Sequence, residues 1–145
     1  MNRLDGKVAI VTGGIGGIGQ AITELFAQEG AKVAIFDIAK KEAAQLLERV
    51  GAAKGQSKFY QVDITSSPAV ERAVRAVSDD LGPVDILVNN AAIPGTSRLT
   101  HEASAEDFDR VFAVNVKGTF LCTKFVVASM LAEGRKGSVI NISST

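Results

Sequence analysis

The stretch Thr12-Gly13-Gly14-Ile15-Gly16-Gly17-Ile18-Gly19 decides the fold, because it joins a strand-like run to a helix-like stripe. The run before it, Lys7 to Val11, is a nearly continuous series of apolar residues, typical of a strand covered on both faces. After it, residues 18–26 repeat apolar side chains at helical spacing, and the repeat stops before Gly30. The sequence therefore predicts a strand, a glycine turn and a helix in direct succession.

Glycines between a strand and a helix suit a dinucleotide pyrophosphate. The phosphates need a backbone that they can approach closely, free N–H groups and the positive end of a helix dipole. A tight turn with close strand–helix packing is the alternative, but the position directly after the first strand favours phosphate binding. A nucleotide-kinase loop would need Gly-Lys-Ser/Thr, whereas Gly19 is followed by Gln20 and Ala21.

Outward from this turn, short apolar runs alternate with helical stripes along the whole chain. We expect strands at 7–11, 32–36, 59–64, 84–88 and 138–142, the third of them suited to an edge. We expect helices near 18–29, 43–50, 68–81 and 104–131, with Ser67 as an N-cap and Pro68 at the first helical position of the third. There is no internal repeat and no linker.

This order predicts an α/β fold, because parallel strands joined by right-handed helical crossovers form a doubly wound sheet. We expect a Rossmann-type parallel sheet with strand order 3-2-1-4-5 and one NAD-binding domain over residues 1–145.

Asp37 ends the second predicted strand, 18 residues after Gly19. A dinucleotide fold places a carboxylate here, against the ribose hydroxyls of adenosine. The alternatives are a solvated loop acid or a helix N-cap. In the first interpretation a 2′-phosphate would meet like charge at Asp37, and no arginine stands at Gly16 or Ile38 to offset it. NAD is therefore the expected cofactor, in preference to NADP.

Three further motifs follow in order on the later elements. The fourth strand ends in Asn89-Asn90-Ala91-Ala92, the long helix carries Asn115-Val116-Lys117-Gly118, and the fifth strand ends in Asn141-Ile142-Ser143-Ser144. Together with the glycine turn, these motifs resemble the classical short-chain dehydrogenase/reductase family, and the resemblance extends from Leu4 to Thr145. Ala92 departs from the family pattern, where glycine is commoner.

The resemblance implies a cofactor site in which Thr12 braces the turn against the strand that ends at Asn89. The pair Asp63-Ile64 would hold the adenine edge, and Asn89 and Ala91 would contact the cofactor through their backbone. The complete set of implied cofactor-binding residues is Thr12, Gly13, Gly17, Ile18, Gly19, Asp37, Ile38, Asp63, Ile64, Asn89 and Ala91.

Two residues are implied in catalysis. Ser144 matches the family position that hydrogen-bonds the substrate oxygen. Asn115 would lie at a bend of the long helix and hold a water that relays protons. At 100° per residue, Asn115 also shares the apolar side of the helix with Phe108, Phe112, Thr119, Cys122 and Val126. A buried amide without partners costs ~1–3 kcal/mol, so a structural asparagine that caps a strand end is the alternative.

The family's chemistry also depends on a Tyr-x-x-x-Lys pair, in which the tyrosine is the general acid/base. The only tyrosine is Tyr60, and residue 64 is isoleucine rather than lysine. We therefore expect these residues to be part of a longer enzyme that transfers a hydride between nicotinamide and a secondary alcohol or ketone. Alone, the chain is expected to bind cofactor without turnover, and its fifth strand would be an uncovered apolar edge.

Other functional classes are less consistent with the sequence. A non-catalytic dinucleotide-binding module remains the main alternative. A methyltransferase would leave the asparagine and serine motifs without a use. The net charge is zero, with 46% hydrophobic residues, so we expect no nucleic-acid partner. No metal-ligand spacing, signal peptide or long apolar run is evident, which leads us to expect no metal, no membrane and a cytoplasmic location. The resemblance implies a homo-oligomer at full length.

Overall fold

The computed structural model describes residues 2–51 and 56–144, and strands alternate with helices throughout. The strands are β1 (Val8–Thr12), β2 (Lys32–Asp37), β3 (Ser57–Gln61), β4 (Ile86–Asn89) and β5 (Ser138–Asn141). The helices are α1 (Gly17–Gln28), α2 (Ala43–Gly51), α3 (Ser67–Leu81), η1 (Thr100–Glu102), α4 (Ala105–Phe112), η2 (Ala113–Gly118) and α5 (Thr119–Ala132).

The strands form one parallel sheet in the order β3-β2-β1-β4-β5, as the sequence predicts. Strand β1 is central, pairing with β2 on one side and β4 on the other. All the neighbours run parallel, so the carboxyl ends of β1, β2 and β4 meet at one edge of the sheet. The glycine turn, Asp37 and the asparagine motif all begin at this edge.

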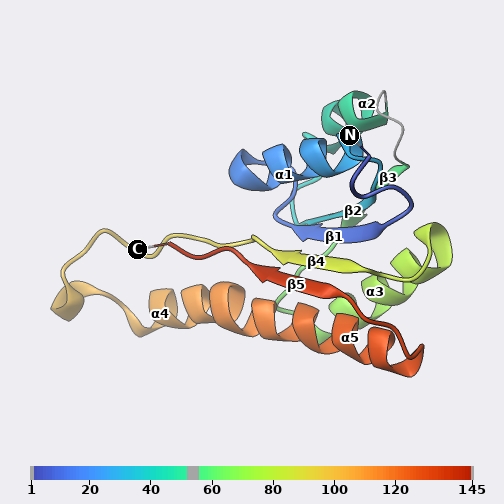
Figure 1. The fold of residues 1–145 in the computed structure, drawn as a ribbon. Helices are drawn as coiled ribbons and strands as arrows, with labels where there is room; N and C mark the ends of the chain where they lie inside the picture. The colour runs from blue at the N-terminus through green and yellow to red at the C-terminus, as the bar shows by residue number, and fades with distance from the viewer. Residues whose placement is uncertain (1, 52–55, 145) are drawn as a thin grey trace.

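Helices cover both faces of the sheet, with α1 and α2 on one side and α3 and α5 on the other (Figure 1). Successive residues of β1 contribute to opposite cores. Ile10 packs with residues of α3 and α5, and Val11 packs with residues of α1 and α2. Because each face of the strand is buried, apolar residues occupy every position rather than alternate ones.

The long helix spans Ala105–Ala132, close to its predicted bounds, and η2 is a π-helical turn in its middle. Ser104 caps it, since its hydroxyl accepts a hydrogen bond from the Asp107 amide at 3.1 Å. The predicted apolar side is wrong at one end. Phe108 and Phe112 are 59% and 48% exposed, whereas the downstream members of that side, such as Cys122, are buried. The difference follows the packing partners: α4 (Ala105–Phe112) has no buried residue, whereas α5 packs against β4 and α3.

Two local predictions also need correction. Helix α3 is capped by Ser66, one residue before the predicted Ser67, and the Ser66 side chain makes no capping hydrogen bond. Strand β3 begins at Ser57 and ends at Gln61. It does lie at an edge, as expected, and that position explains its mixed composition.

Strand β5 forms the other edge, and its side chains are exposed, including Val139 at 38% and Ile140 at 41%. The expected uncovered apolar edge is thus present. The long helix, Ala105–Ala132, also contains an 18-residue window of mean hydropathy 1.5, so by length and composition alone it could cross a bilayer. The sequence expectation missed it because polar residues interrupt the run. Mostly buried core helices pass the same test; this helix buries Cys122 and Val126 in the core, and 22% of the window is buried.

Candidate functional site

A cavity of about 410 Å³ opens at the edge of the sheet where β1, β2 and β4 end. Six of the predicted cofactor-binding residues line it: Gly13, Asp37, Ile38, Asp63, Ile64 and Ala91. The other lining residues are Gly16, Phe36, Val62, Asn90, Ala92, Ile93 and Val114. Segments that are far apart in the sequence therefore form one pocket.

The glycine turn needs glycine for two separate reasons. Gly13 and Gly17 have φ of 61° and 51°, a region that residues with a Cβ rarely adopt. At Gly19 the need is space, because a Cβ there would overlap the Gly13 carbonyl and lie 2.5 Å from Nδ2 of Asn90. A Cβ on Gly13 would lie 2.9 Å from Cα of Ala91. The turn is thus pressed against the segment that follows β4.

Thr12 fastens these two segments together. Its hydroxyl accepts hydrogen bonds from the backbone N–H groups of Asn90 and Ala91, both at 3.0 Å, and donates to the Val88 carbonyl at 3.4 Å. The side chain is 1% exposed. The arrangement confirms the expected brace between Thr12 and the β4 strand.

Asn90 is the site residue that the sequence reasoning left without a role. Its side-chain amide donates to the carbonyls of Thr12 at 3.0 Å and Gly13 at 3.2 Å. It therefore holds the start of the glycine turn to the segment that follows β4. The motif Asn89-Asn90-Ala91-Ala92 is evident in the sequence. The direction of the Asn90 side chain, however, follows only from how closely β1 and β4 approach each other.

Asp37 lies at the carboxyl end of β2 and is partly exposed at the cavity. One carboxylate oxygen accepts from the Ala39 amide at 3.1 Å, and the other faces the Ile15 amide at 3.5 Å. Neither contact uses both lone pairs of an oxygen, so the carboxylate can still accept hydrogen bonds from a ligand's hydroxyl groups.

Asp63 and Ile64 form the next part of the wall. An Asp63 oxygen accepts from the backbone N–H of Thr65 at 2.9 Å and from its hydroxyl at 2.7 Å, which fixes the turn after β3. Ile64 is 8% exposed and belongs to the core on the α3 and α5 side. This pair therefore places one acid and one apolar side chain on the cavity.

Asn89 does not line the cavity. It is 5% exposed, and its side-chain amide donates to the Thr123 hydroxyl and to Oδ1 of Asn141. Its carbonyl accepts from the Ile142 amide at 2.9 Å. In this structure Asn89 holds β4 to β5 and α5, and the residues of the motif that line the cavity are Asn90, Ala91 and Ala92.

Asn115 lies in the π-helical turn and is partly buried. Its side chain makes a matched pair of hydrogen bonds with the Ile93 backbone, accepting from the N–H at 2.9 Å and donating to the carbonyl at 3.0 Å. The amide thus has the partners that its position demands. It caps the segment after β4, the structural arrangement that was one of its two interpretations.

Thr12, Gly17, Ile18, Gly19 and Ser144 are also outside the cavity lining. The first four build the turn and the start of α1 beside it. Ser144 follows β5, in a C-terminal stretch that runs beside the segment after β4 (Figure 1). It is therefore at the same edge of the sheet as the cavity.

Two titratable residues can be set aside as reactive groups. Burial, together with its hydrogen bond to Asp80, raises the pKa of Tyr60 far above its usual value, so this tyrosine keeps its proton. Burial raises the pKa of the Cys122 thiol to about 12. Among residues 2–51 and 56–144 there is no group of three or more His, Cys, Asp or Glu side chains placed to bind a metal ion.

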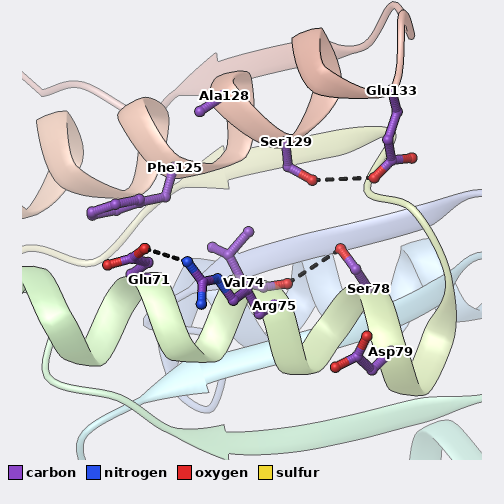
Figure 2. Close-up of a pocket in the computed structure, with 9 residues that line it drawn as sticks. All are labelled: Glu71, Val74, Arg75, Ser78, Asp79, Phe125, Ala128, Ser129 and Glu133. Carbon is purple, nitrogen blue, oxygen red and sulfur yellow. Dashed lines mark hydrogen bonds and ion pairs between the residues drawn. The ribbon is translucent and has the colours of Figure 1, made fainter.

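A second cavity, of about 390 Å³, lies between α3 and α5. Figure 2 shows its charged lining, with Glu71 paired to Arg75 at 2.6 Å and Ser129 facing Glu133. Its residues come from two helices, with no glycine turn and no strand end among them. Its lining therefore differs from that of the first cavity, which combines the glycine turn with residues at strand ends.

Comparison with known proteins identifies the family. A family model described as short chain dehydrogenase matches residues 7–145. The chain belongs to the short-chain dehydrogenase family. Sorbitol dehydrogenase from Cereibacter sphaeroides is 40% identical over 142 residues, which are 98% of this chain and 54% of that protein. D-threitol dehydrogenase from Mycolicibacterium smegmatis is 39% identical over 144 residues, 98% of this chain and 54% of that protein.

Solved structures of the short-chain dehydrogenase family share the fold. NAD⁺-bound xylitol dehydrogenase superposes with a TM-score of 0.93 at 32% identity, over 98% of this chain and 54% of that one. A short-chain type dehydrogenase/reductase from Mycobacterium marinum gives 0.94 at 27% identity, over 99% and 57%. The chain spans about half the length of the relatives it matches.

Proposed function

We propose that this chain is the NAD-binding part of an oxidoreductase that acts on a secondary alcohol or ketone. The observation that carries the proposal is that the glycine turn and the Asp37 carboxylate border the same cavity. One supplies amides without side chains, and the other supplies an acceptor for a sugar diol.

The residues present fit a dinucleotide. The turn at Gly13 and Gly19 leaves no room for a Cβ, and the first amides of α1 have no acceptor within the helix. We infer that these amides hold the pyrophosphate, while Asp37 accepts hydrogen bonds from the adenosine ribose. Asp63 and Ile64 then border the adenine. A 2′-phosphate would add a second negative charge beside Asp37, which favours NAD over NADP.

A bound nicotinamide dinucleotide supplies the hydride acceptor or donor. Among this chain's residues, we propose that the Ser144 hydroxyl donates a hydrogen bond to the substrate oxygen. Asn115 holds the Ile93 segment in place, since both polar atoms of its side chain are bonded there. The 145 residues contain no Tyr-x-x-x-Lys, so we expect them to bind cofactor without turnover.

We extend the proposal to assembly, as a homo-oligomer formed through the long helix. The support is an exposed apolar surface along this helix, here called the helix face and formed by Phe108, Phe112, Val116 and Phe120. Phe108 and Phe112 stack with 4.3 Å between ring centres, so the two exposed rings form one aromatic cluster. Such patches mark contact sites on proteins.

The cofactor proposal is tested by calorimetric titration of the chain with NAD and NADP. Asp37→Asn removes a charged acceptor, a change typically worth about 1.5–3 kcal/mol, so NAD should bind roughly tenfold or more weakly. NADP affinity should change less, because the repulsion is removed at the same time. Asp79→Asn, in the second cavity, is the matched control and should bind NAD like the unaltered chain. Tighter binding of NADP than NAD by the unaltered chain would contradict the proposal.

A further inference from the structure

Gly118, the last residue of the π-helical turn, packs against the wall of the cavity. It is buried, and a Cβ on it would lie 2.5 Å from Cδ1 and 2.7 Å from Cγ1 of Ile64. Its φ and ψ are −60° and −46°, which any residue adopts in a helix. The requirement for glycine at this position therefore comes from space and not from backbone conformation.

Ile64 connects this contact to the cavity. Its side chain packs on the helix at Gly118, and the residue also lines the cavity beside Asp63. The atoms that a Cβ would meet are the outer atoms of a side chain, which can move by rotation, unlike backbone. A methyl group at position 118 would force Ile64 away from the helix, and the open space beside it is the cavity.

The same π-helical turn reaches the cavity wall at two other places. Val114 lines the cavity directly, and Asn115 holds Ile93, another lining residue, by two hydrogen bonds. Short π-helical turns occur frequently at functional sites. Here the turn contributes to the wall of one pocket in three ways. Val114 lines it directly, whereas Gly118 and Asn115 each contact another residue that lines it.

We propose that Gly118 is a positioning residue for the cofactor: its missing side chain sets how far Ile64 stands from the cavity and so fixes the width of the adenosine end. The inference rests on the proposed function, because it assigns that end of the cavity to adenosine. Gly118 itself does not line the cavity, and it affects the bound cofactor only through the position of Ile64.

The experiment combines Gly118→Ala with a series at position 64, using titration with NAD, ADP-ribose and nicotinamide mononucleotide. In the unaltered background, Gly118→Ala should weaken NAD and ADP-ribose by about tenfold, as expected for one misplaced methyl group in a pocket. In Ile64→Val, which lacks Cδ1, the same change should cost less. In Ile64→Ala, which also lacks Cγ1, it should cost little. Binding of nicotinamide mononucleotide should not follow this trend.

Gly51→Ala is the matched control, because Gly51 ends α2 and a Cβ there would meet nothing within 4 Å. Its NAD affinity should be unchanged. Circular dichroism and thermal melting establish that each variant folds, and the Ile64→Val background carries the comparison if Ile64→Ala does not. The inference is overturned if Gly118→Ala binds NAD normally, or if its effect is equal in all position-64 backgrounds. If the unaltered chain binds neither NAD nor ADP-ribose, the proposed function itself fails.

Discussion

Thr12 joins two strands with a single hydroxyl group, because two backbone amides donate to it and one carbonyl accepts from it. The threonine ends a strand, and its partners are 76 to 79 residues further along the chain. At the scale of one residue, the glycine turn therefore owes its position as much to a buried hydroxyl as to its glycines.

Thr12→Val tests this contribution with almost no change of volume. The substitution leaves the amides of Asn90 and Ala91 without their acceptor, and an unsatisfied buried amide costs about 1–3 kcal/mol. We expect the free energy of unfolding in urea to fall by about 2 kcal/mol or more. Thr12→Ser keeps the hydroxyl and should lose less. Equal stability of the Val and Ser variants would show that these hydrogen bonds contribute nothing.

The sequence predicts residues of this kind only in part. The positions of Gly13, Asp37 and Asp63 follow from strand ends, because parallel strands finish at the same edge. The side chain of Asn90 could not be placed, because it turns back to the Thr12 and Gly13 carbonyls across a contact between distant segments. Asn89, one residue earlier, is buried in the protein, and Asn90 lines the cavity instead.

At the scale of elements, the long helix shows where periodicity fails as a predictor. Its bounds were predicted within about one residue, since the Ser104 cap and the glycines after the helix mark them. Its faces were not, because apolar periodicity does not tell which turns of a helix have a packing partner, and α4 buries none of its residues. The result is an apolar face at Phe108 and Phe112 that points outward, toward solvent.

If the helix face pairs two copies of the chain, a charge placed on it should separate them. We expect Phe120→Lys, at a side chain 60% exposed, to lower the weight-average mass in sedimentation equilibrium while leaving the circular dichroism spectrum unchanged. Leu25→Lys on α1, at a side chain 49% exposed, is the control and should leave association unchanged. A mass unaffected by Phe120→Lys would rule out this face as the contact.

At the scale of the whole molecule, the strand order was predictable, because the alternation of runs and stripes leaves few arrangements with right-handed crossovers. Both cores were also visible in the apolar runs of β1 and β2, which are buried on either side. The bounds of β3 were harder to predict, since an edge strand is covered less completely and its composition is mixed.

The rate at which Cys122 is labelled would show whether the molecule unfolds cooperatively. Its thiol is 1% exposed between α5 and the sheet, and burial raises its pKa to about 12. At pH 8 we expect a disulfide reagent to label it only when the chain unfolds, since labelling requires an accessible thiolate. Labelling should speed up with urea in step with global unfolding. Rapid labelling without denaturant would show that α5 opens locally.

The same thiol predicts a pH dependence of stability. Because the folded thiol binds its proton more tightly than the unfolded one, the free energy of unfolding should fall as the pH rises above about 9.

The central position of β1 has a consequence for synthesis. Its two partners, β2 and β4, end at residues 37 and 89, so both edges of β1 are paired only when β4 has left the ribosome. At elongation rates of about 5–20 residues per second, this wait lasts several seconds. During that time an apolar five-residue strand has one bare edge. In a nascent chain with this topology, β1 therefore keeps an unpaired edge until residues far along the sequence have been added.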